Sequence, residues 1–256
     1  MPNRFVQQLM TAMWLWAAVS GCRSTLQPVQ YHAVENRMSD TVRAFDAHID
    51  SVIMPYRESL RKEMDEVVVE SEAVFTKKQP ESSLGNLLAD IELKKAIDYT
   101  HAPVDFAIIN YGGIRLPQLP QGNITVGKVY ELMPFDNMLV VVELDGKSTA
   151  LLFERMAEAG GVPLAGARFT VIDGKIKDIT IGGQPFDESR TYRVALSDYL
   201  ANGGDQLDFL KGKTQVASNK LLRDAFIEGF REIKNRGEKI KPQLDGRVRI
   251  AVPEKH

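Results

Sequence analysis

The sequence predicts an α+β domain built around mixed sheets. Helix-type and strand-type hydrophobic spacings alternate along the chain, segments rich in strands and turns gather in its later part, and no internal repeat occurs. We expect this domain over residues 67–252. Before it, apolar residues three and four apart over 35–66 predict a long connector helix, in which Pro55 introduces a kink or joins two helices.

The first half of the domain mixes helices with strands. β-Branched residues predict a strand over 67–75. Ser83 is a suitable N-cap for a helix that runs to about Tyr99, with leucine and isoleucine near one face. A buried-type strand, a short helix and a second strand are then predicted at 104–109, 126–133 and 138–144.

The second half is rich in turns. Asp145-Gly146 leads into another helix, and Asp173-Gly174 is a typical hairpin turn between two strand-like segments. A strand, an amphipathic helix and a closing strand complete the domain. The ranges predicted in this half are 148–159, 168–172, 175–181, 191–196, 221–233 and 247–252.

Residues 1–22 are typical of a bacterial lipoprotein signal. Arg4 precedes a short apolar stretch, and Val19-Ser20-Gly21-Cys22 resembles a lipobox, in which the cysteine is diacylated and becomes the new N-terminus. The alternatives are an uncleaved anchor and a plain signal with a chance cysteine. We expect an exported protein that is lipid-anchored at Cys22 to the bacterial cell envelope, on the periplasmic or the surface face of the outer membrane, with residues 23–34 as a tether.

Composition argues against several functional classes. The net charge of −2 offers no basic excess of the kind that nucleic-acid binding uses. Cys22 is the only cysteine, so neither an intramolecular disulfide nor a Cys-x-x-Cys site can form. The four histidines have no metal-ligand spacing and are expected at the surface. We therefore expect no metal site, cofactor or catalytic residue in this chain.

Three segments carry groups that suit ligand binding. Residues 110–115 (Asn-Tyr-Gly-Gly-Ile-Arg) follow a predicted strand and combine accessible backbone with a guanidinium, which binds phosphate or carboxylate. Residues 199–205 join an aromatic ring, a glycine bend and a carboxylate, and 133–137 add a ring and an amide. A nucleotide requires such stacking, hydrogen-bonding and cationic groups. The alternative is three ordinary turns.

These segments resemble, in the same order, three signatures of the C-terminal domain of the 5'-nucleotidase family. Residues 110–115 resemble the (N/S)GGGIR segment, 132–137 the PFGN-type segment and 198–205 the NFLANGGD segment. Ser83-Leu84-Gly85-Asn86-Leu87 stands ahead of them as in the family. The resemblance extends from about Val67 to Arg249 and implies a mixed α/β domain that binds a nucleotide.

The resemblance also implies roles for the matching residues. Phe135 and Tyr199 would sandwich the base, and Asn137 would bond its edge. Asp205 would bind the ribose hydroxyls, and Arg115 the phosphate, with Asn110 near the phosphate end. The candidate substrate-binding residues are Asn110, Gly112, Gly113, Arg115, Phe135, Asn137, Tyr199, Asn202, Gly204 and Asp205.

The chain departs from the family pattern at several positions. Tyr111 replaces a glycine, Tyr199 replaces a phenylalanine and Asp136 replaces another glycine. Where the family has an upstream arginine, this sequence has only Lys77 and Lys78. These changes alter the phosphate loop and add a hydroxyl and a carboxylate beside the expected base site.

The resemblance further implies that hydrolysis depends on another polypeptide. Family enzymes carry a metallophosphatase domain with two metal ions, but its motifs do not occur here, and residues 23–66 are too few to hold it. We expect a chain that is inactive alone and that serves nucleotide catabolism with a separately encoded metallophosphatase, which supplies the divalent metal pair. The alternatives are a stand-alone nucleotide- or nucleoside-binding lipoprotein and a decayed domain kept as a structural or adhesion element.

Overall fold

The computed structural model describes residues 47–251. Cys22, the predicted signal and tether, and residues 35–46 of the predicted connector helix lie outside the described residues. Within the described range, no helix is both long and apolar enough to cross a membrane.

The helices lie close to the predicted ranges. One helix continues through Pro55 instead of two helices meeting there. Helix α5 (Gly146–Glu158) begins two residues earlier than expected, because the carboxylate of its N-cap residue Asp145 accepts a hydrogen bond from the Ser148 backbone N–H. The helices are α2 (Ala47–Met64), α3 (Ser83–Thr100), α4 (Val126–Leu132), α5 (Gly146–Glu158), α6 (Asp198–Ala201) and α7 (Leu222–Asn235), with 3-10 turns η1 (Tyr111–Gly113), η2 (Gly204–Gln206) and η3 (Asp208–Leu210).

The N-cap of α3 is Ser82, so the assignment of this role to Ser83 is wrong. Ser82 has an extended backbone, and its side-chain oxygen accepts a hydrogen bond from the Gly85 N–H at 3.0 Å. The Ser83 hydroxyl oxygen instead accepts a hydrogen bond from the Thr76 N–H at 3.1 Å. The two serines therefore cap the helix and join it to the preceding strand.

The strands form a five-stranded sheet in the order β12-β6-β11-β3-β7, a four-stranded sheet in the order β10-β9-β8-β13, and the pairs β1-β5 and β2-β4. The predicted strand over 67–75 is in fact β1 and β2, which belong to different pairs. The predicted hairpin is confirmed as β8 and β9. The strands are β1 (Val67–Ser71), β2 (Phe75–Thr76), β3 (Phe106–Ile108), β4 (Gln118–Leu119), β5 (Gly122–Thr125), β6 (Met138–Asp145), β7 (Leu164–Ala165), β8 (Ala167–Ile172), β9 (Lys175–Ile181), β10 (Gln184–Pro185), β11 (Thr191–Ser197), β12 (Gln215–Leu221) and β13 (Val248–Ala251).

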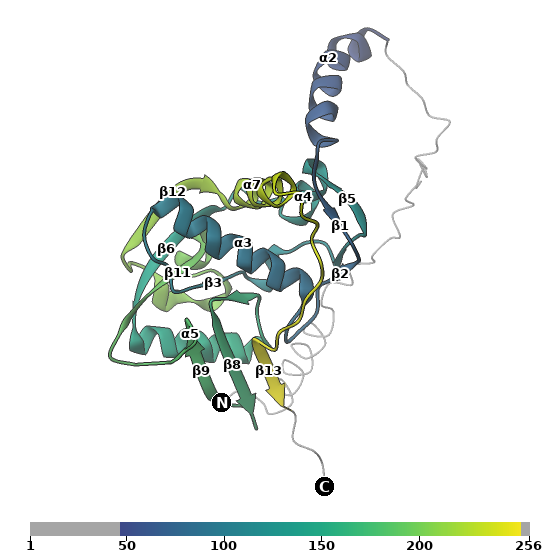
Figure 1. Ribbon diagram of the computed structural model, residues 1–256. Coiled ribbons are helices and arrows are strands. Elements are labelled where there is room, and N and C mark those ends of the chain that lie inside the picture. Colours follow the sequence, from purple (N-terminus) through teal and green to yellow (C-terminus); the bar gives the residue numbers. More distant parts are fainter. Residues whose placement is uncertain (1–46, 252–256) are drawn as a thin grey trace, which may run out of the picture. The chain divides into compact units, whose positions relative to one another are not determined.

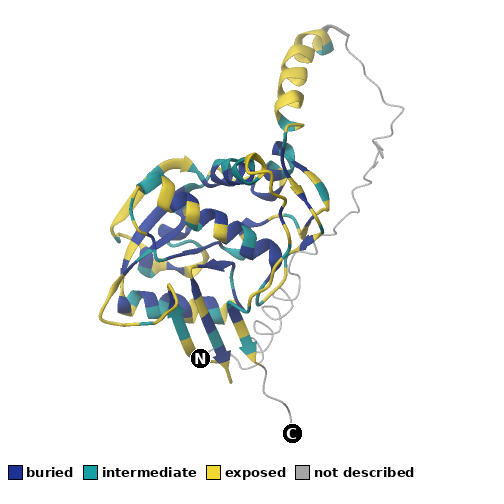
Figure 2. Ribbon diagram, viewed as in Figure 1, coloured by how far each residue is buried: buried dark blue, intermediate teal, exposed yellow. Residues whose placement is uncertain are grey.

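The five-stranded sheet separates two hydrophobic cores. Leu139 and Val141 of β6 pack in one core with α3 and α7. Val140 and Val142 point to the opposite face and pack in the other core with α5 and β8. Figure 1 shows α3 and α7 on one side of this sheet and α5, β8 and β9 on the other. Strands β3, β6, β7 and β11 and much of α3 are mostly buried, whereas the edge strand β12 is largely exposed (Figure 2). The predicted α+β fold with mixed sheets is confirmed.

Candidate functional site

The topology of the five-stranded sheet brings the three candidate binding segments to one edge, where β3 and β11 end and β6 begins. β11 pairs in parallel with β3, so the loop beginning at Asn110 leaves the same edge as Tyr199. β11 is antiparallel to β6, with Ser197 opposite Leu139, so Asn137 at the start of β6 lies at that edge as well. The Asp198 carboxylate accepts a hydrogen bond from the Met138 N–H at 3.0 Å and ties two of the segments together.

A buried arginine supports the segment that carries Phe135. The Arg223 side chain, 7% exposed, donates to the Asp136 carboxylate at 2.7 Å and to the Phe135 carbonyl at 3.3 Å. Its guanidinium also lies 4.1 Å from the centre of the Tyr130 ring. The Phe135 side chain itself is 40% exposed. Arg223 thus holds the backbone of this turn while the phenyl ring remains available to a ligand.

Arg115 lies beside the Phe135 ring. Its backbone N–H donates to the Leu132 carbonyl at 2.9 Å, which joins the first segment to the end of α4. Its guanidinium carbon is 5.8 Å from the centre of the Phe135 ring. The side chain is exposed and donates to the Gly112 carbonyl at 3.4 Å. A cation and an aromatic face are therefore neighbours at this edge of the sheet.

Lys77 is a second cation at the same place. The sequence analysis named it only as a departure from the upstream arginine of the family and gave it no role. Its ammonium group donates to the Ile114 carbonyl at 2.7 Å and lies 4.0 Å from the centre of the Tyr111 ring. Burial, and then the positive charge of Arg115, lower the pKa of Lys77. An anionic ligand near both cations would relieve their mutual repulsion.

Tyr199 and Asp205 form a compact hydrogen-bonded pair in the third segment. The Tyr199 hydroxyl donates to Asp205 Oδ1 at 2.8 Å and accepts from the Asp205 N–H at 3.2 Å. The bond to the Asp205 carboxylate raises the pKa of Tyr199. A Cβ on Gly204 would lie 2.5 Å from the Tyr199 ring, so this position requires glycine. The Tyr199 side chain remains 44% exposed.

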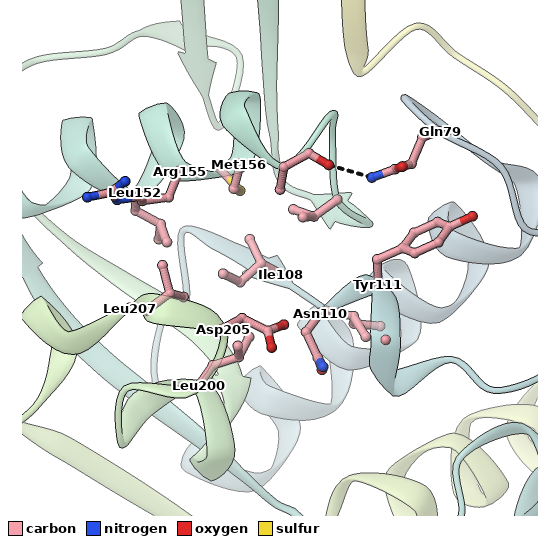
Figure 3. Close-up of a pocket in the computed structure, with 14 residues that line it drawn as sticks. Gln79, Ile108, Asn110, Tyr111, Leu152, Arg155, Met156, Leu200, Asp205 and Leu207 are labelled. Carbon is pink, nitrogen blue, oxygen red and sulfur yellow. Dashed lines mark hydrogen bonds between the residues drawn. The ribbon is translucent and has the colours of Figure 1, made fainter. Parts of the chain in front are cut away.

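Asn110 and Asp205 also line a pocket of about 120 Å³. Its floor consists of buried apolar side chains, including Ile108, Leu152 and Leu207. Figure 3 shows the Asp205 carboxylate directed toward this pocket, beside Asn110. The arrangement places a hydrogen-bond acceptor in the lining of a largely apolar pocket.

The remaining candidate residues differ in their hydrogen bonds and in their exposure. The Asn137 side-chain amide has no hydrogen bond within the described residues, so it is available to a ligand, whereas its carbonyl accepts from the Leu222 N–H. The Asn202 amide donates to the Asp198 carbonyl at 2.8 Å and stabilises the turn after α6. Gly112 is exposed. Gly113 is buried, and a Cβ there would lie 2.6 Å from Asn110 Oδ1.

The sequence analysis missed Arg223 and Lys77 as parts of this edge. Arg223 lies at the start of α7 on its buried face, and a charged residue among apolar helix positions was the available signal. Lys77 reaches Ile114 across 37 residues, a contact that no local pattern reveals.

Comparison with known proteins places this arrangement in a family. Residues 65–212 match the profile described as 5'-nucleotidase, C-terminal domain. The chain belongs to this family. A relative, the trifunctional nucleotide phosphoesterase protein YfkN of Bacillus subtilis, is 32% identical over 186 residues, which is 66% of this chain and 12% of the relative. The cell wall protein Lmo0130 of Listeria monocytogenes is 29% identical over 183 residues, 65% of this chain and 23% of the relative.

A solved member of the family has the same fold. The structure of a 5'-nucleotidase precursor from Thermus thermophilus superposes with a TM-score of 0.67 at 28% identity, covering 80% of this chain and 43% of that one. The chain therefore spans less than half the length of each of these family members. Within the described residues of this chain, no group of three or more histidine, cysteine, aspartate or glutamate side chains could hold a metal ion.

Proposed function

We propose that this chain is the nucleotide-recognition half of a 5'-nucleotidase. The observation that carries the proposal is the convergence, at one sheet edge, of the three segments that match the family signatures. Their side chains supply aromatic faces, an unpaired amide, a carboxylate and two cations. These are the groups that a base, a ribose and a phosphate require.

Each part of the nucleotide has a complementary group at this edge. Phe135 and Tyr199 are 40% and 44% exposed, so each ring has exposed surface on which a base can stack. Asn137 can bond the base edge, and Asp205 can accept hydrogen bonds from the ribose hydroxyls. Arg115 with Lys77 forms the phosphate end, since a guanidinium binds phosphate through paired hydrogen bonds.

We propose that a separate metallophosphatase supplies the divalent metal pair for hydrolysis. Such ions activate water and stabilise the leaving oxygen. One observation supports a partner: α2 exposes apolar side chains on one face. Val52, Ile53, Tyr56 and Leu60 recur at helical spacing and are 43% to 76% exposed. We infer that this α2 face contacts the phosphatase.

We also propose that the protein is exported and lipid-anchored at Cys22, on the outer membrane. The lipobox-like Val19-Ser20-Gly21-Cys22 sequence supports export and anchoring, together with a relative that is named a cell wall protein. Arg23-Ser24 after the cysteine, in place of an inner-membrane aspartate signal, supports the outer membrane. Growth with labelled palmitate would place label on the wild type and none on Cys22→Ser.

Calorimetric titration with adenosine, AMP and UDP-glucose tests nucleotide recognition. We expect residues 23–256 to bind at least one of them, and binding of none would refute the proposal. A lone metallophosphatase from the same genome would then be added with Mn²⁺ and AMP. Release of phosphate by the mixture, but by neither protein alone, would support the split enzyme. Binding without such release would favour a stand-alone nucleotide-binding lipoprotein.

Replacement of Arg115 by alanine is expected to weaken AMP binding selectively. Loss of a hydrogen bond to a charged group costs about 1.5–3 kcal/mol, which corresponds to about 10- to 150-fold in affinity. Adenosine, which has no phosphate, should bind within about twofold of wild type. Titration of Arg115→Ala and Lys77→Ala with both ligands measures this difference.

Lys147→Ala is the matched control for these cation variants. Lys147 is exposed near the start of α5, which follows the opposite end of β6 from Asn137. It should therefore leave both affinities unchanged. Equal losses of AMP and adenosine affinity in Arg115→Ala would contradict a phosphate role for Arg115.

A further inference from the structure

We propose that Tyr199 is a positioning residue that makes ribose-hydroxyl recognition depend on its own hydroxyl group, by holding the Asp205 carboxylate in place. This inference rests on the proposed nucleotide recognition and adds a specificity determinant to it. Where the resembled NFLANGGD signature has phenylalanine, this chain has Tyr199, so the hydroxyl is a departure from that signature.

The two residues are joined in both directions. The Tyr199 hydroxyl donates to Asp205 Oδ1 at 2.8 Å, and the same oxygen accepts from the Asp205 backbone N–H at 3.2 Å. One hydroxyl therefore fixes both the backbone and the side chain of Asp205. A phenylalanine ring could make neither bond.

The Asp205 backbone needs such support. Asp205 has φ 50° and Gln206 has φ 64°, so two consecutive non-glycine residues lie in the left-handed region. This conformation is unfavourable for most side chains and persists where the surroundings stabilise it. Tight packing of the Tyr199 ring against Gly204 holds the phenol where its hydroxyl can make both bonds.

The bonds leave one carboxylate oxygen for a ligand. Tyr199 occupies Oδ1, whereas Oδ2 of Asp205 has no hydrogen-bond partner among the described residues. The carboxylate is directed toward the apolar pocket, beside Asn110 (Figure 3). A hydrogen bond from a ligand hydroxyl to Oδ2 would be strengthened by the nearby apolar side chains of Ile108 and Leu207.

The stacking ring and the hydroxyl-binding carboxylate thus form one unit. Removal of the Tyr199 hydroxyl keeps the ring and its stacking face but releases Asp205 to adopt other orientations. Affinity for a ligand that bonds Asp205 should fall, whereas affinity for a ligand that only stacks should remain.

A comparison of adenosine with 2',3'-dideoxyadenosine tests this inference by calorimetry. For Tyr199→Phe we expect adenosine affinity to fall about tenfold, the lower end of the loss for one hydrogen bond to a charged group, and dideoxyadenosine affinity to change less than about twofold. Asp205→Asn should lose adenosine affinity similarly. In the Tyr199→Phe/Asp205→Asn double variant, the two losses should be less than additive, because both variants disturb the same contact.

Tyr56→Phe is the matched control, because Tyr56 lies on α2, outside the candidate site, and its hydroxyl has no hydrogen bond within the described residues. It should keep both affinities. Unchanged adenosine binding in Tyr199→Phe, or equal losses for both nucleosides, would overturn the inference while leaving nucleotide recognition intact. If the wild type bound neither nucleoside, nor AMP nor UDP-glucose, the proposed function would fail and this inference with it. Thermal unfolding of each variant verifies that the fold is retained.

Discussion

Replacement of both Phe135 and Tyr199 by alanine is expected to weaken adenosine binding by at least about 30-fold. Stacking of a base on one aromatic side chain contributes about 1–3 kcal/mol, so loss of two faces costs about 2 kcal/mol or more. The Tyr199 change also removes the bond to Asp205, which adds to the loss for ribose-containing ligands. Calorimetric titration of wild type, both single variants and the double variant measures the effect.

The fold should tolerate these substitutions. Phe135 and Tyr199 are 40% and 44% exposed, so their truncation removes little from either hydrophobic core. Tyr56→Ala is a suitable control, because Tyr56 is a 76% exposed aromatic residue on α2, outside the candidate site. If the double variant bound adenosine within about twofold of wild type, the base sandwich would be wrong.

Replacement of Glu92 by methionine is expected to stabilise the protein by about 1–3 kcal/mol at neutral pH, since apolar side chains often replace buried charged groups with a gain in stability. Glu92 lies in α3 with no exposed surface, and neither of its carboxylate oxygens has a hydrogen-bond partner among the described residues. Methionine is of similar length and buries no charged group. Urea unfolding of wild type and Glu92→Met measures the difference.

The gain in stability of Glu92→Met over wild type should grow as pH rises. Burial raises the pKa of Glu92 well above its ordinary value of 4.5, so the folded state retains a proton that the unfolded state releases above that value. This group therefore makes the wild type progressively less stable, relative to the variant, as pH rises from about 4.5 toward the folded-state pKa. Unfolding at about pH 5.5 and about pH 8.5 should show a larger difference at the higher value.

Glu92→Gln separates the stability cost of burying a charge from the cost of burying unpaired polar atoms. It cannot ionise, so it should remove the pH-dependent loss, but its unpaired polar atoms should keep its stability at low pH below that of Glu92→Met. A Glu92→Met gain that is the same at both pH values would show that Glu92 does not have a raised pKa in the folded protein.

Much of the fold could be predicted because local patterns report local structure. The hairpin around Asp173-Gly174 and the helix ending near Tyr99 occur where turn chemistry and apolar spacing place them. β12 was missed because Gln215–Leu221 is largely exposed and lacks alternating burial. It is a strand because its backbone pairs with β6, a long-range partner that its own residues do not encode.

The sequence by itself determined the kinds of groups that this protein offers to a ligand and the order in which they occur, because signatures and composition are properties of the chain. Only the tertiary structure decided that these groups meet. The parallel pairing of β11 with β3 and its antiparallel pairing with β6 bring segments far apart in sequence to one edge. The tertiary structure likewise decided that Lys77 and Arg223 lie at this edge and that Tyr199 bonds Asp205. Each depends on the direction of a side chain across packed elements, which no local spacing specifies.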